Sequence, residues 1–291
     1  MFQTIPNYIS ELNEAIIKQK SVEILHAKLK TFDKFSHKGD RGHAALFAGS
    51  VGMMGACILA ARACSKSGAG KITTIVPPTC FDLIHSTVPE AVVISNETQD
   101  IQYSIFNSIG IGPGLGIELL NKALITYIFS YNKPMVIDAD ALNFLAKHPI
   151  LIKKIPKSSI LTPHLLEWKR LFGEVSHDRE RIEKSVSIST QYGIFILIKG
   201  HFSCLTTPTG KVFFNATGNA GMAKGGSGDV LTGLITGLLA QGYDPETAAL
   251  LGMYIHGIAG DMAKTSLGEE AMTPSDLLNF FSAAFTEIRN I

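Results

Sequence analysis

The sequence predicts an α/β protein in which a mostly parallel central sheet is covered by helices on both faces. Three observations lead to this prediction. Short, almost continuously apolar runs alternate with helical patterns from about residue 43 onward, which is typical of parallel strands buried on both faces. The apolar runs end in glycine, aspartate or proline, where turns are expected. The last third of the chain, from residue 229, has mainly helical patterns.

These patterns give the expected elements in chain order. A loose helical pattern with many polar residues predicts an N-terminal helical extension over residues 1–35, and residues 36–291 are interpreted as a single domain. Strands are expected at 43–48, 71–76, 108–111, 135–137, 159–161 and 194–198. Helices are expected at 54–67, 117–131, 140–147, 165–172, 178–192, 229–241, 245–265 and 273–288.

The composition excludes several classes of protein. Hydrophobic residues make up 46% of the 291 residues and charged residues 18%, which suits a compact protein with a large core. A net charge of +1 without a basic stripe argues against a nucleic-acid partner. No apolar stretch approaches the ~20 residues that cross a bilayer, and no secretory signal is evident, so we expect no membrane partner. The four cysteines form no Cys-x-x-Cys pair, which favours reduced thiols in a cytoplasmic protein.

Residues 215–233 are the most informative stretch, because six glycines fall there and the run Gly226-Ser227-Gly228-Asp229 leads into a helical pattern. Glycine lets backbone N–H groups converge on an anion, and the following helix presents its positive end to the same place. Asp229 then puts a carboxylate beside this anion hole, where it can take a proton from a hydroxyl near a phosphate. The alternative is a glycine-rich turn in which Ser227 or Asp229 caps the helix.

Further candidate residues follow the strands, where ligands bind in parallel α/β sheets. Together with residues 215–229 they predict one site. The segments are 49–52, 110–116, Asp138-Ala139-Asp140, Thr162-Pro163-His164 and Lys199-Gly200.

The glycine-rich segment 110–116 is not a dinucleotide-binding fingerprint, because it does not follow the first strand and contains a proline. This disfavours a hydride-transferring Rossmann enzyme. The segment either lets a bulky ligand lie against its backbone or forms a tight turn.

Each polar residue at a strand end has two interpretations. Asp138 and Asp140 can hold a magnesium–phosphate network through water, or Asp140 can cap a helix that begins at Ala141. His164 can donate to a carbonyl or phosphate and titrate near neutrality, or it can be structural. Lys199 follows an apolar run and must either meet an anion or extend its amine to water.

Together these residues resemble the ADP- or ATP-dependent NAD(P)H-hydrate dehydratases, which have a ribokinase-like fold. The resemblance covers about residues 37–260. It departs from the family pattern at Met53, at Leu165 and Leu166, and at Ala220, although Glu167 is kept. The matching stretches are His37-Lys38-Gly39, 49–56, Gly68-Ala69-Gly70, Pro89-Glu90, 111–116, 138–142, Thr162-Pro163-His164, Lys199-Gly200 and 215–229.

The resemblance implies a three-layer α/β/α sandwich and a metabolite-repair enzyme, in which a nucleotide phosphorylates the hydrate hydroxyl and phosphate then leaves. Asp229 would activate this hydroxyl, and the amides of Gly226, Ser227 and Gly228 would form the anion hole. The substrate-binding residues would be Ala56, Gly112, Gly114, Gly116, His164, Asn219 and Asp229. The nucleotide-binding residues would be Lys199, Gly200, His201, Phe202, Ser203 and Gly228.

The resemblance also implies partners: the hydrate of NADH or NADPH, ADP or ATP with Mg²⁺, and an NAD(P)H-hydrate epimerase as functional partner. No metal ligand in the chain is certain. A homo-oligomer is expected, a tetramer being the expected form. Two other functions stay open: a kinase of a small alcohol or vitamin precursor on the same fold, and a nucleotide-sensing module without turnover.

Overall fold

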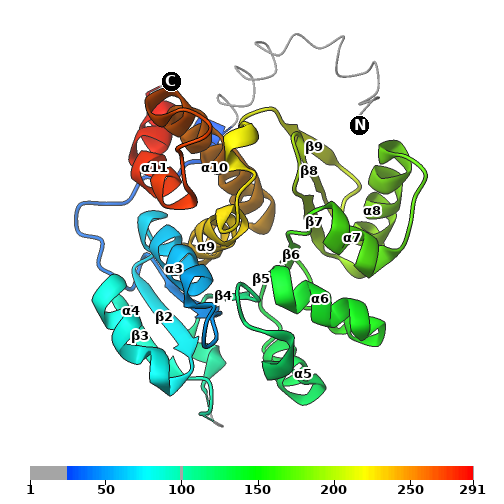
Figure 1. The fold of residues 1–291 in the computed structure, drawn as a ribbon, viewed down its shortest axis with the longest axis horizontal. Coiled ribbons are helices and arrows are strands. Elements are labelled where there is room, and N and C mark those ends of the chain that lie inside the picture. Colours follow the sequence, from blue (N-terminus) through cyan, green and yellow to red (C-terminus); the bar gives the residue numbers. More distant parts are fainter. Residues whose placement is uncertain (1–24, 99–100, 291) are drawn as a thin grey trace.

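The computed structural model describes residues 25–98 and 101–290, in which one nine-stranded sheet runs through the molecule (Figure 1). The strand order is β3-β2-β1-β4-β5-β6-β7-β8-β9. Neighbouring strands from β3 to β7 are parallel, and β8 and β9 extend the sheet as antiparallel strands. The mostly parallel sheet predicted from the sequence is therefore confirmed.

The six predicted strands are present, with ends that differ by at most one residue. They are β1 (His43–Phe47), β2 (Lys71–Val76), β4 (Ser108–Ile111), β5 (Met135–Ile137), β6 (Ile160–Leu161) and β7 (Phe195–Ile198). Three strands were not predicted: β3 (Ala91–Ser95), β8 (Ser203–Thr206) and β9 (Val212–Asn215). None of these three is followed by an α-helix that leads to a parallel neighbour, so the strand–helix alternation that revealed the others is missing there.

The helices also follow the prediction closely. They are α3 (Met54–Lys66), α4 (Phe81–Thr87), α5 (Lys122–Ser130), α6 (Ala139–Lys147), α7 (Leu165–Phe172), α8 (Asp178–Tyr192), α9 (Ser227–Ala240), α10 (Pro245–Leu267) and α11 (Pro274–Arg289). Short 3₁₀ segments are η1 (Pro78–Cys80), η2 (Tyr103–Ile105), η3 (Ile117–Leu119), η4 (Pro149–Lys154) and η5 (Ala220–Met222). The predicted helix 117–131 is wrong in its first turn, because η3 and α5 are separate; α4 was not predicted.

Alternate residues of each strand face two different cores, as expected for a sheet covered on both faces. In β5, Val136 joins the core formed with α9, α10 and α11, whereas Met135 and Ile137 join the core formed with α5 to α8. In β7, Leu197 joins the first of these cores and Ile196 joins the second. This is the predicted three-layer α/β/α arrangement, with the two helical layers visible on either side of the sheet in Figure 1.

Helix α9 lies at the centre of one helical layer and packs closely on α3. A Cβ atom on Gly233 would lie 1.9 Å from the Ala60 carbonyl oxygen, so the two helix backbones nearly touch. This packing fixes the position of α9, whose first turn carries the glycine-rich segment.

The predicted N-terminal extension lies mostly outside the described residues, which begin at residue 25. Its described part is helical at residues 25–28, and Leu25 is buried in the core formed with α10 and α11. Among the described residues no helix is both long and apolar enough to span a lipid bilayer.

Candidate active site

A cavity of about 690 Å³ lies where the carboxyl ends of β5, β6 and β7 meet the start of α9. Asp138 enters it after β5, His164 and Glu167 after β6, and Lys199 after β7. The segment from Asn215 to Leu231 contributes much of the remaining wall, and Met253, His256 and Gly257 of α10 complete it. The sequence-predicted residues in this lining are His164, Lys199, Gly200, His201, Ser203, Asn219, Gly226, Ser227, Gly228 and Asp229.

The first turn of α9 has the geometry of an anion-binding site. Gly226 precedes the helix with a φ of 104°, a conformation that favours glycine, and no side chain caps this helix end. Among the described residues, the backbone amides at 225, 226, 228 and 229 have no hydrogen-bond acceptor, so they can bind oxygen atoms of a ligand. The Ser227 amide instead donates to the Lys224 carbonyl, at 3.3 Å.

The capping interpretation of this turn is wrong. The Ser227 hydroxyl donates to the Met222 carbonyl oxygen, 2.7 Å away, and so does not cap the helix. Asp229 is the third helical residue and borders the cavity.

Asp229 has a pKa close to neutrality. Burial is the main cause and the negative charge of Asp138 the next, and together they raise the pKa to about 7 although Lys199 opposes the shift. A carboxylic acid with this pKa is partly ionised at neutral pH and can accept a proton from a hydroxyl. A perturbed carboxyl group in a cavity is characteristic of a catalytic site.

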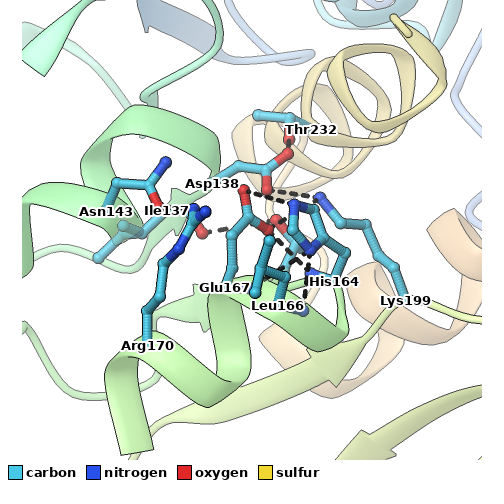
Figure 2. Close-up of polar contacts among 10 residues, drawn as sticks. Ile137, Asp138, Asn143, His164, Leu166, Glu167, Arg170, Lys199 and Thr232 are labelled. Carbon is cyan, nitrogen blue, oxygen red and sulfur yellow. Dashed lines mark hydrogen bonds and ion pairs between the residues drawn. The ribbon is translucent and has the colours of Figure 1, made fainter. Parts of the chain in front are cut away.

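Asp138 and Lys199 form an ion pair within electrostatic reach of Asp229. The Lys199 Nζ atom lies 2.6 Å from Oδ1 of Asp138, which is only 1% exposed, and the Thr232 hydroxyl donates to Oδ2 at 2.7 Å. Figure 2 shows both contacts meeting at the Asp138 carboxylate. Of the two alternatives left open for Lys199, the structure shows the contact with an anion, and this anion is a carboxylate of the chain itself.

Gly228 leaves the space that this ion pair needs. A Cβ atom there would lie 3.1 Å from the Lys199 Nζ atom and 3.6 Å from Oδ2 of Asp138. The second residue of α9 is therefore in direct contact with the buried charges.

His164 and Glu167 form a reciprocal cap at the start of α7. The His164 Nδ1 atom accepts hydrogen bonds from the amides of Leu166 and Glu167, at 3.1 and 3.3 Å, and Oε2 of Glu167 accepts from the His164 amide at 2.8 Å. Since Nδ1 is the acceptor, a neutral ring carries its proton on Nε2. The structural interpretation of His164 is confirmed by this cap. The side chain is also 49% exposed and lines the cavity, where its donation to a ligand stays a prediction.

Glu167 connects this cap to the ion pair. Its Oε2 atom lies 3.8 Å from the Lys199 Nζ atom, and its residue is only 4% exposed. Burial raises the pKa of this carboxyl group above its ordinary value, while the charge of Lys199 counteracts the effect. Figure 2 shows Glu167 between His164 and Asp138.

Five predicted site residues are not in the cavity lining: Ala56, Gly112, Gly114, Gly116 and Phe202. The ring of Phe202 packs edge-on against His201, with 4.5 Å between ring centroids. The other four belong to a second glycine-rich region, in which the loop after β4 lies on the loop after β1. There the Ser50 hydroxyl donates to the Gly114 carbonyl at 2.9 Å, and a Cβ atom on Gly114 would lie 2.8 Å from the Ala56 Cβ atom.

The second glycine-rich region is close enough to Asp229 to affect its charge. The Asp140 carboxylate accepts a hydrogen bond from the Gly116 amide at 2.9 Å, and its charge helps to raise the pKa of Asp229. The prediction that Asp140 caps a helix from Ala141 is wrong, because α6 already begins at Ala139. Asp229 thus lies within electrostatic reach of both glycine-rich regions.

Sequence reasoning missed two residues that contact the site. Thr232 on α9 holds Asp138, and His256 on α10 lies with its Nε2 atom 2.9 Å from the Ser227 carbonyl oxygen. Burial lowers the pKa of His256 to about 4, so its ring is neutral and Nε2–H donates to this carbonyl. The available signal was a polar residue inside an apolar helical run, which is unusual without a partner.

A metal site built from the chain alone is not present in the part that the structure describes, where no three His, Cys, Asp or Glu side chains are arranged to hold an ion. Both oxygens of Asp138 already accept hydrogen bonds.

Comparison with known proteins identifies the family. The model of the NAD(P)H-hydrate dehydratase family matches residues 44–282. The ADP-dependent (S)-NAD(P)H-hydrate dehydratase of Staphylococcus aureus is 33% identical over 88% of this chain and 92% of its own length. The bifunctional NAD(P)H-hydrate repair enzyme Nnr of Moorella thermoacetica is 37% identical over 84% of this chain, but only 49% of that relative is covered. The chain thus spans about half the length of the bifunctional relatives that it matches.

Solved structures agree with the sequence comparison. The crystal structure of the ADP/ATP-dependent NAD(P)H-hydrate dehydratase from Bacillus subtilis, co-crystallised with ATP and Mg²⁺, superimposes with a TM-score of 0.81 and 30% identity, covering 92% of this chain and 97% of that one. The ribokinase-like fold expected from the resemblance is confirmed by such neighbours. The match over most of the chain, together with the glycine-rich turn and its buried aspartate, shows that the chain belongs to the NAD(P)H-hydrate dehydratase family.

Proposed function

We propose that this protein converts the (S)-hydrate of NADH or NADPH back to the reduced dinucleotide, with ADP or ATP as phosphoryl donor. The observation that carries this proposal is Asp229, whose pKa is raised to about 7 and which follows a turn of unpaired amides on the wall of one cavity. The names of relatives in the same family supply the substrate class.

In the proposed reaction Asp229 takes the proton of the hydrate hydroxyl as this oxygen attacks the terminal phosphorus of the nucleotide. A new O–P bond forms and the bond from phosphorus to the leaving nucleotide breaks. The amides of Gly226 and Gly228 lie where they can hold the transferring group. Loss of phosphate from the ring carbon, with a proton from the neighbouring carbon, then restores the double bond.

Lys199 supports this chemistry through position rather than as a free cation. Its ammonium group is neutralised by Asp138, and residues 199–203 continue from it along the cavity as the proposed nucleotide-binding segment, of which Phe202 is not in the lining. Phosphoryl transfer depends mainly on positioning and charge stabilisation. Mg²⁺ bound with the nucleotide would neutralise the phosphate charge, and Asp138 and Asp229, which both line the cavity, would contact its water shell.

Ala56, Gly112, Gly114 and Gly116 remain proposed contacts of the hydrate. Gly116 donates to Asp140, whose charge helps to raise the pKa of Asp229, so this second region lies within electrostatic reach of Asp229. A substrate that reaches from the cavity past Asp229 to this second region would contact both.

The test is incubation of the purified protein with the hydrate and either ADP or ATP, followed at the absorbance of the reduced nicotinamide. We expect nucleotide-dependent recovery of absorbance and release of one phosphate per hydrate consumed. A stable phosphorylated alcohol, formed from a panel of vitamin precursors while the hydrate is untouched, contradicts the proposal and favours a kinase. Tight nucleotide binding without consumption of any hydrate favours a sensing module.

The assembly and location of the protein are part of the same proposal. We propose a homo-oligomer, with the tetramer expected, in the cytoplasm. We also propose that an NAD(P)H-hydrate epimerase acts with it, because the bifunctional relatives have a second half that this chain does not cover. Light scattering of the purified protein tests the oligomer.

A further inference from the structure

We propose that Asp261, on α10, is a positioning residue that keeps the cavity wall at Gly218 and Asn219 in its working conformation; its effect on turnover rests on the proposed function. One carboxylate oxygen of Asp261 accepts a hydrogen bond from the Gly218 amide at 2.9 Å, and the other accepts one from the Asn219 Nδ2 atom at 3.0 Å. Gly218 and Asn219 line the cavity, whereas Asp261 is not among the lining residues. Asp261 therefore acts on the site through the residues that it holds.

The wall segment is pressed directly onto α10. The Asn215 side chain donates to the Met253 carbonyl oxygen at 3.0 Å, and a Cβ atom on Gly257 would lie 2.1 Å from the Thr217 Oγ1 atom. Gly218 has a φ of 105°, a conformation that ordinary side chains rarely adopt. These contacts fix the distance between the wall segment and α10. Asp261 also determines which groups of the segment face it, because a carboxylate can only accept hydrogen bonds and therefore needs donors opposite it.

The group that Asp261 orients is the side-chain amide of Asn219. Its oxygen accepts the Gly221 amide at 3.0 Å while its nitrogen donates to Asp261 at 3.0 Å. If the side chain were turned over, its NH₂ group would face the Gly221 N–H and its oxygen would face the carboxylate. Asp261 therefore specifies one of the two orientations of this amide.

From Asn219 the constraint continues to the anion-binding turn. The Gly221 amide belongs to η5, and the last residue of η5, Met222, accepts the Ser227 hydroxyl at 2.7 Å. Ser227 is the first residue of α9 and immediately follows the unpaired Gly226 amide. Three hydrogen bonds, with the peptide bond from Gly221 to Met222 between the second and the third, thus join Asp261 to the turn that is proposed to hold the phosphoryl group.

Asp261→Asn tests this series without changing the shape of the side chain. The introduced amide has one oxygen, and if that oxygen accepts the Gly218 N–H, its NH₂ group faces the NH₂ of Asn219. Two donors then oppose each other, and no rotation of either amide satisfies Gly218, Gly221 and both side chains together.

The double substitution Asp261→Asn with Asn219→Asp removes the conflict. The carboxylate at 219 accepts from both Gly221 and the new amide at 261, whose oxygen still accepts from Gly218. All three hydrogen bonds are thus present again, and only the bond between residues 219 and 261 has its donor and acceptor exchanged. A role that depended only on the packing of Asp261 would not be repaired by this exchange.

We would measure hydrogen exchange of residues 215–222 in the protein without substrate, and kcat/KM with the hydrate. Asp261→Asn should speed exchange of the Gly218 and Gly221 amides and lower kcat/KM, each at least about tenfold. The double variant should return the exchange of both amides to within about threefold of wild type; its turnover is not part of the test, because Asn219 lines the cavity. The control is Asp244→Asn at the N-cap of α10, where asparagine caps equally well; it should change neither.

Unchanged exchange in Asp261→Asn, or a double variant that exchanges as fast as the single one, overturns the proposal. An Asp261→Asn variant that exchanges faster but keeps the wild-type kcat/KM also contradicts it, because the wall conformation would then not be what turnover requires. The exchange measurement needs no substrate, so an inactive wild-type protein would refute the proposed function and leave the test of Asp261 decisive.

Discussion

The two glycine-rich regions of this protein differ in whether their backbone amides have hydrogen-bond acceptors within the protein. After β4, the amides of Gly112 and Gly116 donate to the Phe47 carbonyl and to the Asp140 carboxylate. At the start of α9, the amides of Gly226 and Gly228 have no acceptor among the described residues. Gly112 and Gly116 of the first region are therefore satisfied by the protein itself, whereas the amides of the second are free to bind water or a ligand. Glycine content alone predicts neither property, and the assignment of each N–H group to an acceptor distinguishes them.

The largest expected effect is on Asp229, beside the unpaired amides. Asp229→Asn should lower kcat at least about a hundredfold because the introduced amide cannot accept the proton. The melting temperature should not fall, because Asp229 does not cap α9. The matched control is Asp140→Asn in the other region, whose amide oxygen can still accept from Gly116. Near-normal turnover of Asp229→Asn with a lowered melting temperature would contradict the proposed base.

The next effect compares one glycine from each region. Gly228→Ala puts a Cβ atom 3.1 Å from the Lys199 Nζ atom and should displace an anion-binding amide, lowering kcat by roughly tenfold or more with little loss of stability. Gly114→Ala puts a Cβ atom 2.6 Å from the Met53 carbonyl at a φ of 58° and should cost about 1–3 kcal/mol of unfolding free energy. Kinetics and urea unfolding of both variants measure the two effects, and equal losses of stability would break the comparison.

The pH dependence should follow Asp229. Because its proton must be absent for it to act as a base, kcat/KM should decline as the pH falls through about 7. Its pKa is raised from 3.8 in the folded protein, so the folded state binds more protons than the unfolded state between about pH 4 and 7, and stability falls as the pH rises through this window. Asp229→Asn should reduce this slope in unfolding experiments at several pH values, and the raised pKa of Glu167 should leave part of it. A wild-type kcat/KM that does not change between pH 6 and 8 would contradict the raised pKa of Asp229.

The smallest effect concerns His256, which ties α10 to the first residue of α9. His256→Leu removes the hydrogen bond to the Ser227 carbonyl and should cost about 0.5–1.5 kcal/mol of unfolding free energy. His256→Gln can still donate from a nitrogen near the Nε2 position and should retain most of the stability. Equal destabilisation by leucine and glutamine would show that the ring packing, not the hydrogen bond, is what α9 needs.

Local patterns predicted much of this fold. The strands β2, β4 and β5 have the predicted ends, and α7 and α8 do as well, because each is a complete apolar or amphipathic run bounded by turn residues. Helix α9 begins two residues before its predicted start at 229, since Gly226 itself supplies the turn into the helix.

The site was predictable in part, because its glycines and Asp229 are neighbours in the sequence. What could not be predicted are contacts between distant residues. The bond of Thr232 to Asp138 and the ion pair of Lys199 with the same carboxylate depend on the sheet order, which no local pattern encodes. The same limit applies to Ala56 and to Gly112, which follow parallel strands near the cavity but are not in its lining.

The bond between Thr232 and Asp138 joins residues 94 positions apart, and this separation has a consequence for biosynthesis. Strands β1 to β7 are translated before α9, so the buried carboxylate of Asp138 has no hydroxyl donor until the last third of the chain docks onto the sheet. Closing so long a loop is slow relative to local folding. A nascent or truncated chain that lacks α9 would therefore present an incomplete cavity, without Thr232 and without the glycine-rich turn.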